Sequence, residues 1–252
     1  MCLITFAIEQ HPKYKLILVA NRDEFFERST APLYVWEDYP HILAGRDLQA
    51  GGTWMGVNNQ GALAALTNYR DMDGLKKEAP SRGDLTADFL KREQGAYSYI
   101  KEVSQRAHQY NGFNLLIGDS TGMYYASNYT KGVRQLDPGV YGLSNALLDS
   151  DWVKVQESKR RLTQAIQQHE LSLEDLAALL KDTTLAEDHY LPNTGMPYEW
   201  EKILSSMYIQ PYQGYGTRCS TVILQDYNER WEVMEIGYDE QMREVYSVKK
   251  SF

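Results

Sequence analysis

Cys2, which directly follows the initiator methionine, is the residue of this chain best suited to covalent chemistry. If the methionine is removed, a single residue carries both a thiol and a free α-amine. Their reference pKa values are about 8.5 and about 7.7–8.0, so the amine can take the proton of its own thiol and generate a nucleophile. The alternative interpretation is that Cys2 is a small apolar side chain that opens a buried strand.

A second group of polar side chains, Asn-Arg-Asp-Glu at 21–24, follows an apolar run at 17–20. The stretches 2–9 and 15–20 are rich in apolar and β-branched residues, and the loop between them contains Pro12. This pattern predicts a β-hairpin with a short loop. We therefore expect the polar stretch to lie at the end of the second strand, close to the start of the chain.

The register of this hairpin decides which polar side chain meets Cys2. With the turn centred near Pro12, facing residues have numbers that sum to about 25, which predicts Asp23 opposite Cys2. A shift of one residue places Arg22 there instead. Asp23 is therefore a candidate partner of the thiol, with the alternative that it caps a turn or pairs with Arg22.

The remaining pattern predicts the elements that hold these residues. A second hairpin is predicted over 50–70, with its turn at Asn-Asn-Gln-Gly. Further strands are predicted within 113–128, 139–145, 218–225, 230–239 and 243–250, and helices at 81–93, 96–110, 151–168, 172–182 and 197–208. Because groups of strands are separated by pairs of helices, the pattern favours antiparallel sheets layered with helices over a doubly wound parallel sheet.

Composition and charge exclude several classes of protein. The net charge of −8 argues against nucleic-acid binding, which needs a basic surface. No apolar run approaches the roughly 20 residues of a membrane-spanning helix, and no secretory signal is evident. Cys2 and Cys219 make no disulfide framework, which favours a reduced, cytoplasmic location. The five histidines are scattered without metal-ligand spacing, so no metal or other cofactor is expected.

Four motifs in order along the chain resemble the NRDE protein family, also called the transport and Golgi organisation protein 2 family. They are ANRDEF, AGGTWMGVNNQGALAALTNYR, YGLSNALLDSDWVKV and YGTRCSTVIL. The resemblance spans nearly the whole chain and implies one NRDE-family domain over 1–252. It further implies similarity to N-terminal-nucleophile hydrolases of the choloylglycine hydrolase and penicillin V acylase type. The implied fold is α+β, a four-layer αββα sandwich of two antiparallel sheets between helical layers.

The resemblance also implies roles for single residues. Cys2 stands at the position of the nucleophile, and Asp23 at that of an aspartate that orients the nucleophile and its amine. Asn68 and Asn145 match asparagines that donate hydrogen bonds to a developing oxyanion. Arg218 matches a late arginine that stabilises a thiolate or a substrate carboxylate. The alternatives are ordinary turn residues for both asparagines and a surface ion pair for the arginine.

One position departs from the acylase pattern. That branch has an arginine three residues before its aspartate, where this chain has Ala20, and the nearby arginine is Arg22. In a regular strand Arg22 faces away from Asp23, so it is either structural or directed at something outside the acylase site. The residues predicted to bind substrate are Asn21, Arg22, Trp54 and Tyr69.

Two functions of different classes follow from the resemblance. The first is an N-terminal cysteine hydrolase that cleaves a non-peptide amide or thioester of a small hydrophobic acyl compound. The second is a non-catalytic binding or carrier protein on the same scaffold, which handles haem, lipid or acyl-CoA. A small-molecule acyl ligand is the expected partner in both cases, and a homo-oligomeric assembly is left open. Removal of Met1 separates the two, since the first mechanism needs a free α-amine.

Overall fold

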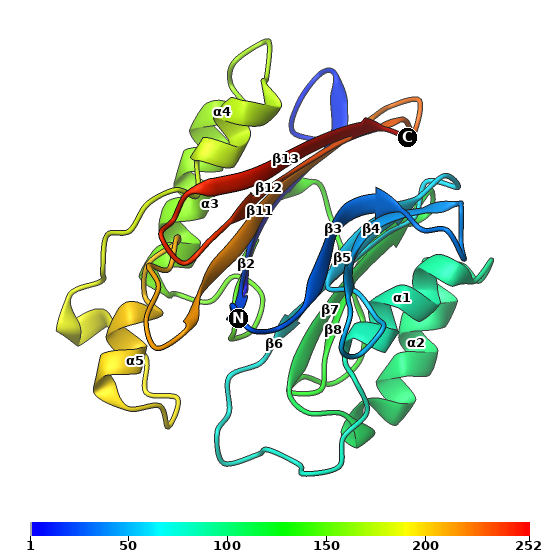
Figure 1. The fold of residues 1–252 in the computed structure, drawn as a ribbon. Helices are drawn as coiled ribbons and strands as arrows, with labels where there is room; N and C mark the ends of the chain where they lie inside the picture. The colour runs from blue at the N-terminus through cyan, green and yellow to red at the C-terminus, as the bar shows by residue number, and fades with distance from the viewer. Residues whose placement is uncertain (1) are drawn as a thin grey trace. The chain divides into compact units, whose positions relative to one another are not determined.

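The structure is a computed structural model that describes residues 2–252 and arranges them in two compact units (Figure 1). Unit 1 comprises the chain up to Glu27 together with Pro138–Ser251, and unit 2 comprises Arg28–Asp137 with Phe252. Each unit consists of one antiparallel sheet and the helices that cover it. The predicted α+β class with antiparallel sheets and helical layers is confirmed, and one family domain over 1–252 stays a prediction.

Unit 1 contains the start of the chain in the interior of a six-stranded sheet. The strand order is β10 (Gly139–Leu143), β1 (Cys2–Ile8), β2 (Tyr14–Phe25), β11 (Tyr215–Asp226), β12 (Trp231–Tyr238) and β13 (Glu244–Ser251). Because β2 and β11 are its central long strands, residues near position 22 are paired on both sides. This pairing positions the polar stretch 21–24.

Helices cover one face of this sheet. They are α3 (Val153–Ala165), α4 (Leu173–Ala178) and α5 (Tyr198–Ile203), with a short 3₁₀ turn at Asp188–Tyr190. The helix α3 packs on β1 and β10, and α4 packs on β2 and β11. Ser172 is the N-cap of α4, because its hydroxyl accepts a hydrogen bond from the Asp175 N–H at 3.0 Å. Among residues 2–252, no helix is long and apolar enough to cross a bilayer.

Unit 2 has a seven-stranded antiparallel sheet and a separate apolar core. The strand order is β3 (Thr30–Val35), β4 (Ile42–Asp47), β5 (Met55–Asn58), β6 (Leu63–Asn68), β7 (Phe113–Asp119), β8 (Gly122–Ser127) and β9 (Arg134–Leu136). The helix α1 (Gly83–Lys91) packs on β5 and β6, and α2 (Ala96–Arg106), followed by a 3₁₀ turn at Ala107–Gln109, packs on β7 and β8. The hairpin predicted over 50–70 is confirmed, and the strands predicted within 113–128 form a second hairpin.

The register of the first hairpin differs by one residue from the favoured prediction. Cys2 pairs with Arg22 and Ile8 pairs with Leu16, so the numbers of facing residues sum to 24. The prediction that Asp23 lies directly opposite Cys2 is therefore wrong, and the alternative register with Arg22 is the observed one. The loop decides this register. The Glu9 N–H donates a 2.8 Å hydrogen bond to the Lys15 carbonyl oxygen, which centres the hairpin on Pro12 rather than between residues 12 and 13.

The polar stretch is part of the strand rather than an exit from it. β2 continues to Phe25, and Asn21, Arg22 and Asp23 are all buried. Polar side chains are tolerated in a buried strand when they find hydrogen-bond partners. Asn21 does so through its amide group, which donates to the main-chain oxygens of Leu180 at 3.0 Å and Met207 at 2.8 Å.

A close backbone approach in unit 2 gives a first testable prediction. A Cβ added at Gly52 would lie 2.6 Å from the carbonyl carbon of Gly83, at the first residue of α1. Because this neighbour is backbone and cannot rotate away, Gly52→Ala is expected to cost about 1–3 kcal/mol of unfolding free energy. Denaturant unfolding measures this against Gly139→Ala, whose added Cβ meets its nearest neighbour, Tyr141, at 3.5 Å. Equal stability of the two variants would contradict the close approach.

Candidate active site

Cys2 and Arg22 lie on the same face of the sheet of unit 1. Arg22 pairs directly with Cys2 of β1 on one side and with Cys219 of β11 on the other. Directly paired residues direct their side chains to one face. The next residue in β1, Leu3, packs in the core beneath the helices, so this row faces away from the helical layer. The sheet therefore places a guanidinium between two thiols.

The thiol of Cys2 is strongly influenced by its surroundings. The residue as a whole is partly exposed, yet burial of its sulfur and the negative charge of Asp23 raise its pKa above the ordinary value. The positive charge of Arg22 and a hydrogen bond from the backbone N–H of Asp23 act in the opposite direction and lower that pKa. The net direction is upward, so the thiol by itself favours the protonated form at neutral pH.

Asp23 lies on the helix-facing side of β2, one residue beyond the pair that Arg22 makes with Cys2. It is almost fully buried, and its Oδ1 accepts a 2.7 Å hydrogen bond from the hydroxyl of Thr217. Burial raises the pKa of the Asp23 carboxyl, while the charge of Lys154 and the Thr217 bond oppose this rise. Asp23 thus lies beside the start of β1, with its side chain on the face opposite to the Cys2 thiol.

Asn145 lies just beyond the end of the neighbouring strand. β10 runs antiparallel to β1 with its last residue, Leu143, opposite Ile4, and Asn145 follows Leu143 by two residues. The side chain of Asn145 is fully buried, and the preceding Ser144 donates a 3.0 Å hydrogen bond to the carbonyl oxygen of Cys2. These contacts tie the end of β10 to the start of β1.

Arg218 occupies a β-bulge. Thr217 pairs with Asp23 and Cys219 pairs with Arg22, so Arg218 is the extra residue of the bulge. Bulges redirect a side chain and are frequent next to active sites. The guanidinium donates to the carbonyl oxygen of Phe25 at 2.8 Å, and burial together with the nearby charge of Arg22 lowers its pKa.

The two faces of the strand give the polar residues of β2 different surroundings. Asn21 is held by the helical layer, as described above, and its Oδ1 accepts a 2.7 Å bond from Ser220. These hydrogen bonds give Asn21 a structural role. The substrate-binding roles of Asn21 and Arg22 stay predictions. Arg22 lies on the same face as Cys2, and its positive charge acts to lower the pKa of the Cys2 thiol.

The remaining predicted residues, Asn68, Trp54 and Tyr69, belong to unit 2. Asn68 is the last residue of β6 and pairs with Phe113, and Tyr69 follows it. The Tyr69 ring stacks on Tyr129 with centroids 3.8 Å apart, and Trp54 lies beneath Gly45, where an added Cβ would meet its ring. The structure brings Cys2, Asn21, Arg22, Asp23, Asn145 and Arg218 together in unit 1, and the roles of the three unit 2 residues stay predictions.

Three buried polar side chains near the site are not singled out by the sequence pattern. Ser144 and Thr217 each precede a predicted site residue, and that adjacency is the only sequence signal for them. Glu235, in the middle of an apolar strand, is 1% exposed and accepts a 2.9 Å hydrogen bond from Tyr246. A charged residue within the apolar pattern of 230–239 is a signal that could identify it.

The pairing of Arg22 with Cys2 gives a second prediction. Arg22→Met is expected to raise the pKa of the Cys2 thiol further, because it removes a positive charge that lowers it. The rate of Cys2 alkylation by iodoacetamide, followed by peptide mass, then rises only at higher pH than in the wild type. Arg230→Met, which removes an exposed arginine from the loop between β11 and β12, serves as the control. An unchanged pH profile for Arg22→Met would exclude this electrostatic influence.

Comparison with known families agrees with the motifs. The model of the family described as Transport and Golgi organisation 2 matches residues 1–240. The chain belongs to this family. Transport and Golgi organization 2 homologs from Mus musculus and Homo sapiens are 36% and 37% identical to it, over 90% of this chain and 90% and 89% of theirs. The Drosophila melanogaster family member is 28% identical, with 93% and 91% of the two chains covered.

Solved structures show which fold this Transport and Golgi organisation 2 chain has. It resembles the C2A mutant of conjugated bile acid hydrolase from Clostridium perfringens with a TM-score of 0.53, covering 100% of this chain and 96% of the other. The Caenorhabditis elegans ortholog of N-acylethanolamine-hydrolyzing acid amidase gives 0.52, with 88% and 92% covered. Both are 10% identical to this chain, so the likeness shows the fold alone, an α+β arrangement of antiparallel sheets and helices.

Proposed function

We propose that this protein is an N-terminal cysteine hydrolase that cleaves a non-peptide amide or thioester of a small hydrophobic acyl compound. The observation that carries the proposal is the convergence of Cys2, Arg22, Asp23 and Asn145 at the start of β1. They come from β1, from β2 and from the segment that follows β10, and none of them is needed there to fill an apolar core. Structural packing alone gives no reason to bury an arginine, an aspartate and an asparagine around a cysteine.

The reaction begins after Met1 has been removed. The α-amine of Cys2 takes the thiol proton, and the resulting thiolate attacks the carbonyl carbon of the substrate. Asp23, which lies one residue beyond the pair of Arg22 with Cys2, holds the amine in place and stabilises its protonated form. Arg22 favours the thiolate through its charge. Because Asp23 acts on the amine and Arg22 acts on the thiol, Asp23 and the thiol can lie on opposite faces of the sheet.

The second half of the reaction releases both products. The tetrahedral intermediate carries a negative oxygen, to which the Asn145 amide donates a hydrogen bond, a contribution of about 3–4 kcal/mol in comparable sites. The protonated amine gives its proton to the leaving group, and the C–N or C–S bond breaks to leave a thioester on Cys2. Water then hydrolyses the thioester and frees the carboxylic acid. Asn68 of unit 2 stays the predicted second oxyanion donor.

The structural relatives support the class of reaction. One is named as an amidase that hydrolyses N-acylethanolamines, and the other as a conjugated bile acid hydrolase. The latter structure carries the substitution C2A, so a cysteine stood at the second position of its chain as in this one. A hydrophobic acyl substrate for this chain is inferred from these names together with the geometry around Cys2.

One observation favours the second candidate function, a binding or carrier protein for haem, lipid or acyl-CoA. Burial raises the pKa of the Cys2 thiol, so without a free α-amine the protonated, weakly nucleophilic form prevails. A chain that keeps its methionine would therefore hold an acyl ligand without cleaving it. The two functions differ in the state of the N-terminus.

The test combines the mass of the native protein with a substrate panel. Intact mass shows whether Met1 is absent, and N-acyl amides and acyl thioesters of increasing chain length are then assayed for release of the carboxylic acid. The hydrolase is supported by a processed N-terminus together with turnover of at least one member. Retention of Met1 in the native protein rules out the amine-based mechanism, and saturable binding without turnover supports the carrier.

A further inference from the structure

Lys154 lies at an unfavourable place for a positive charge. It is the second residue of α3, where the partial charge of a helix start is also positive, and it is 3% exposed. Lysine is rarely buried to this degree unless polar or charged partners compensate for its lost hydration. It belongs to the motif YGLSNALLDSDWVKV, from which the proposed mechanism uses only Asn145. The reason for its burial therefore lies in the interior of unit 1.

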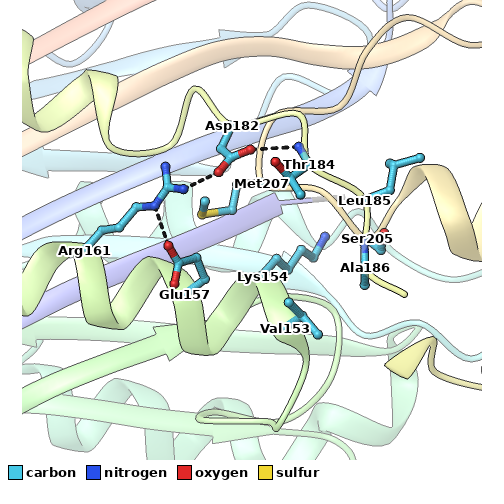
Figure 2. A pocket seen from close by; sticks show the side chains of 10 residues that line it. All are labelled: Val153, Lys154, Glu157, Arg161, Asp182, Thr184, Leu185, Ala186, Ser205 and Met207. Carbon is cyan, nitrogen blue, oxygen red and sulfur yellow. Dashed lines mark hydrogen bonds and ion pairs between the residues drawn. The ribbon is translucent and has the colours of Figure 1, made fainter. Parts of the chain in front are cut away.

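The ammonium of Lys154 is held against the segment 204–209, which follows α5. Its Nζ donates a 2.8 Å hydrogen bond to the carbonyl oxygen of Leu204. Figure 2 shows the side chain extending from α3 towards the part of this segment that carries Ser205. Lys154, Ser205 and Met207 line one pocket of about 340 Å³. The lysine thus meets this segment from the helical layer.

The same segment holds Asp23 from its other end. The main-chain N–H of Ile209 donates a 2.8 Å hydrogen bond to the hydroxyl oxygen of Thr217, and the Ile209 carbonyl oxygen accepts a 3.0 Å bond from the Thr217 N–H. The Thr217 hydroxyl in turn donates to Oδ1 of Asp23 at 2.7 Å. Lys154 and Asp23 are therefore connected through one short segment by a chain of hydrogen bonds.

The charges agree with this connection. Burial raises the pKa of the Asp23 carboxyl, and the positive charge of Lys154 opposes this rise together with the Thr217 hydrogen bond and the charge of Arg22. A buried carboxylate stays ionised only where positive charges and hydrogen bonds compensate for its lost hydration. The lysine therefore favours the charged form of Asp23. In the proposed mechanism only that form stabilises the protonated amine of Cys2.

The acidic side chains that line the pocket beside Lys154 are held by arginine. Arg161 forms ion pairs with both Glu157 and Asp182 (Figure 2). Hydrogen bonds from Arg160 and Arg161 lower the pKa of Glu157 to about 2. Because both carboxylates have arginine partners, neither of them accounts for the burial of Lys154.

We propose that Lys154 is a positioning residue of the candidate active site, which keeps the Asp23 carboxylate charged and, through the segment 204–209, fixes it for its task at the Cys2 amine. This inference rests on the proposed function, because the lysine serves the step that Asp23 performs. Lys154 acts through Asp23 rather than on the substrate. Loss of its charge should therefore change the pH dependence of Asp23 rather than abolish activity at every pH.

The direct test is a titration of Asp23 in the full-length protein, labelled with ¹³C at its aspartate carboxyl carbons. The Asp23 signal is identified by Asp23→Asn, and all proteins are compared in the same N-terminal state, checked by intact mass. Lys154→Met should raise the pKa of Asp23 by about 1 unit or more, because it removes a positive charge. Lys154→Gln, which keeps an N–H for the Leu204 carbonyl but no charge, should raise it similarly. Lys159→Met, on the same helix but paired with Asp149 at 2.6 Å, should leave it almost unchanged.

The pH dependence of hydrolysis is the second readout. The acidic limb of the kcat/KM profile follows the ionisation of Asp23 in the free enzyme. In Lys154→Met this limb should move to higher pH by the same shift as the Asp23 titration, and activity should recover above the new pKa. A purely structural lysine would instead lower activity equally at all pH values, and Lys154→Gln would restore it.

An Asp23 titration that is unmoved in both variants, or moved to lower pH, would overturn the inference. An acidic limb that stays in place in an active Lys154→Met would do the same. The titration needs no turnover, so absence of hydrolysis in the wild type contradicts the proposed function, while a raised Asp23 pKa still supports the action of Lys154 on this carboxyl. If Lys154→Met fails to fold, comparison of Lys154→Gln with Lys154→Arg, which keeps the charge, decides the same question.

Discussion

Cys2→Ala is expected to lower kcat/KM for acyl-amide hydrolysis by at least about 10³-fold, because no other group in the mechanism forms the covalent intermediate. The substitution removes a sulfur from a partly exposed residue at the start of a strand, so the free energy of unfolding should change by less than about 1 kcal/mol. The measurements are steady-state hydrolysis of the best substrate in the panel and denaturant unfolding of both proteins.

Cys219→Ala is the matched control for this experiment. Cys219 is the other thiol of the chain, lies on the same face of the sheet and pairs with the same arginine, Arg22. It is buried, and both burial and the charge of Glu235 raise its pKa well above the ordinary value, so it is a poor nucleophile. Its replacement should leave activity within a few-fold of the wild type. Comparable losses in both variants would point to damage of the sheet rather than to a nucleophile at Cys2.

Asp23→Asn is expected to reduce activity at least about 10²-fold and at the same time to raise the melting temperature at pH 7. Burial raises the pKa of Asp23 above its value in the unfolded chain. The stability that this carboxyl contributes is therefore fully present below the unfolded pKa, about 3.9, and is lost as pH rises through the higher folded pKa. A neutral amide avoids that loss, and its oxygen still accepts the hydrogen bond from Thr217.

A gain of stability with a loss of activity is the expected signature of a residue retained for function. The difference in melting temperature between Asp23→Asn and the wild type should grow as pH rises from 4 and then level off. Asp175→Asn, at an exposed carboxyl in the first turn of α4, should alter neither property. If Asp23→Asn is less stable than the wild type and fully active, the aspartate has only a structural part.

Periodicity and turn chemistry predict most elements of this fold. The first hairpin, the hairpin with its turn at Asn-Asn-Gln-Gly, and the helices near α1, α2, α3 and α4 all follow from short-range patterns. The strands β3 and β4 do not, since no element is predicted between residues 21–24 and the hairpin over 50–70. Strands that are held mainly by pairing with neighbours carry a weak local signal.

The candidate site shows where sequence patterns reach their limit. Asn, Asp and Glu are depleted in strands, and this stretch stays in β2 because of pairing with β1 and β11 and because of distant partners such as the Met207 carbonyl and the Thr217 hydroxyl. The hairpin register rests on the closure of a loop that lacks a two-residue turn signature. The bulge at Arg218 depends on the pairing of β11 with β2, strands far apart in sequence. The motifs identify the candidate residues, but the pairing of distant strands determines on which face of the sheet each side chain lies.

Trapping the covalent intermediate tests the hydrolase proposal most directly. The native protein is mixed with its best acyl thioester, quenched in acid during turnover and digested for peptide mass. The mechanism predicts that the N-terminal peptide begins at Cys2 and carries one acyl group, and that this adduct disappears in Cys2→Ala. Steady hydrolysis without any acyl adduct on Cys2, or with the adduct on Cys219, would contradict it.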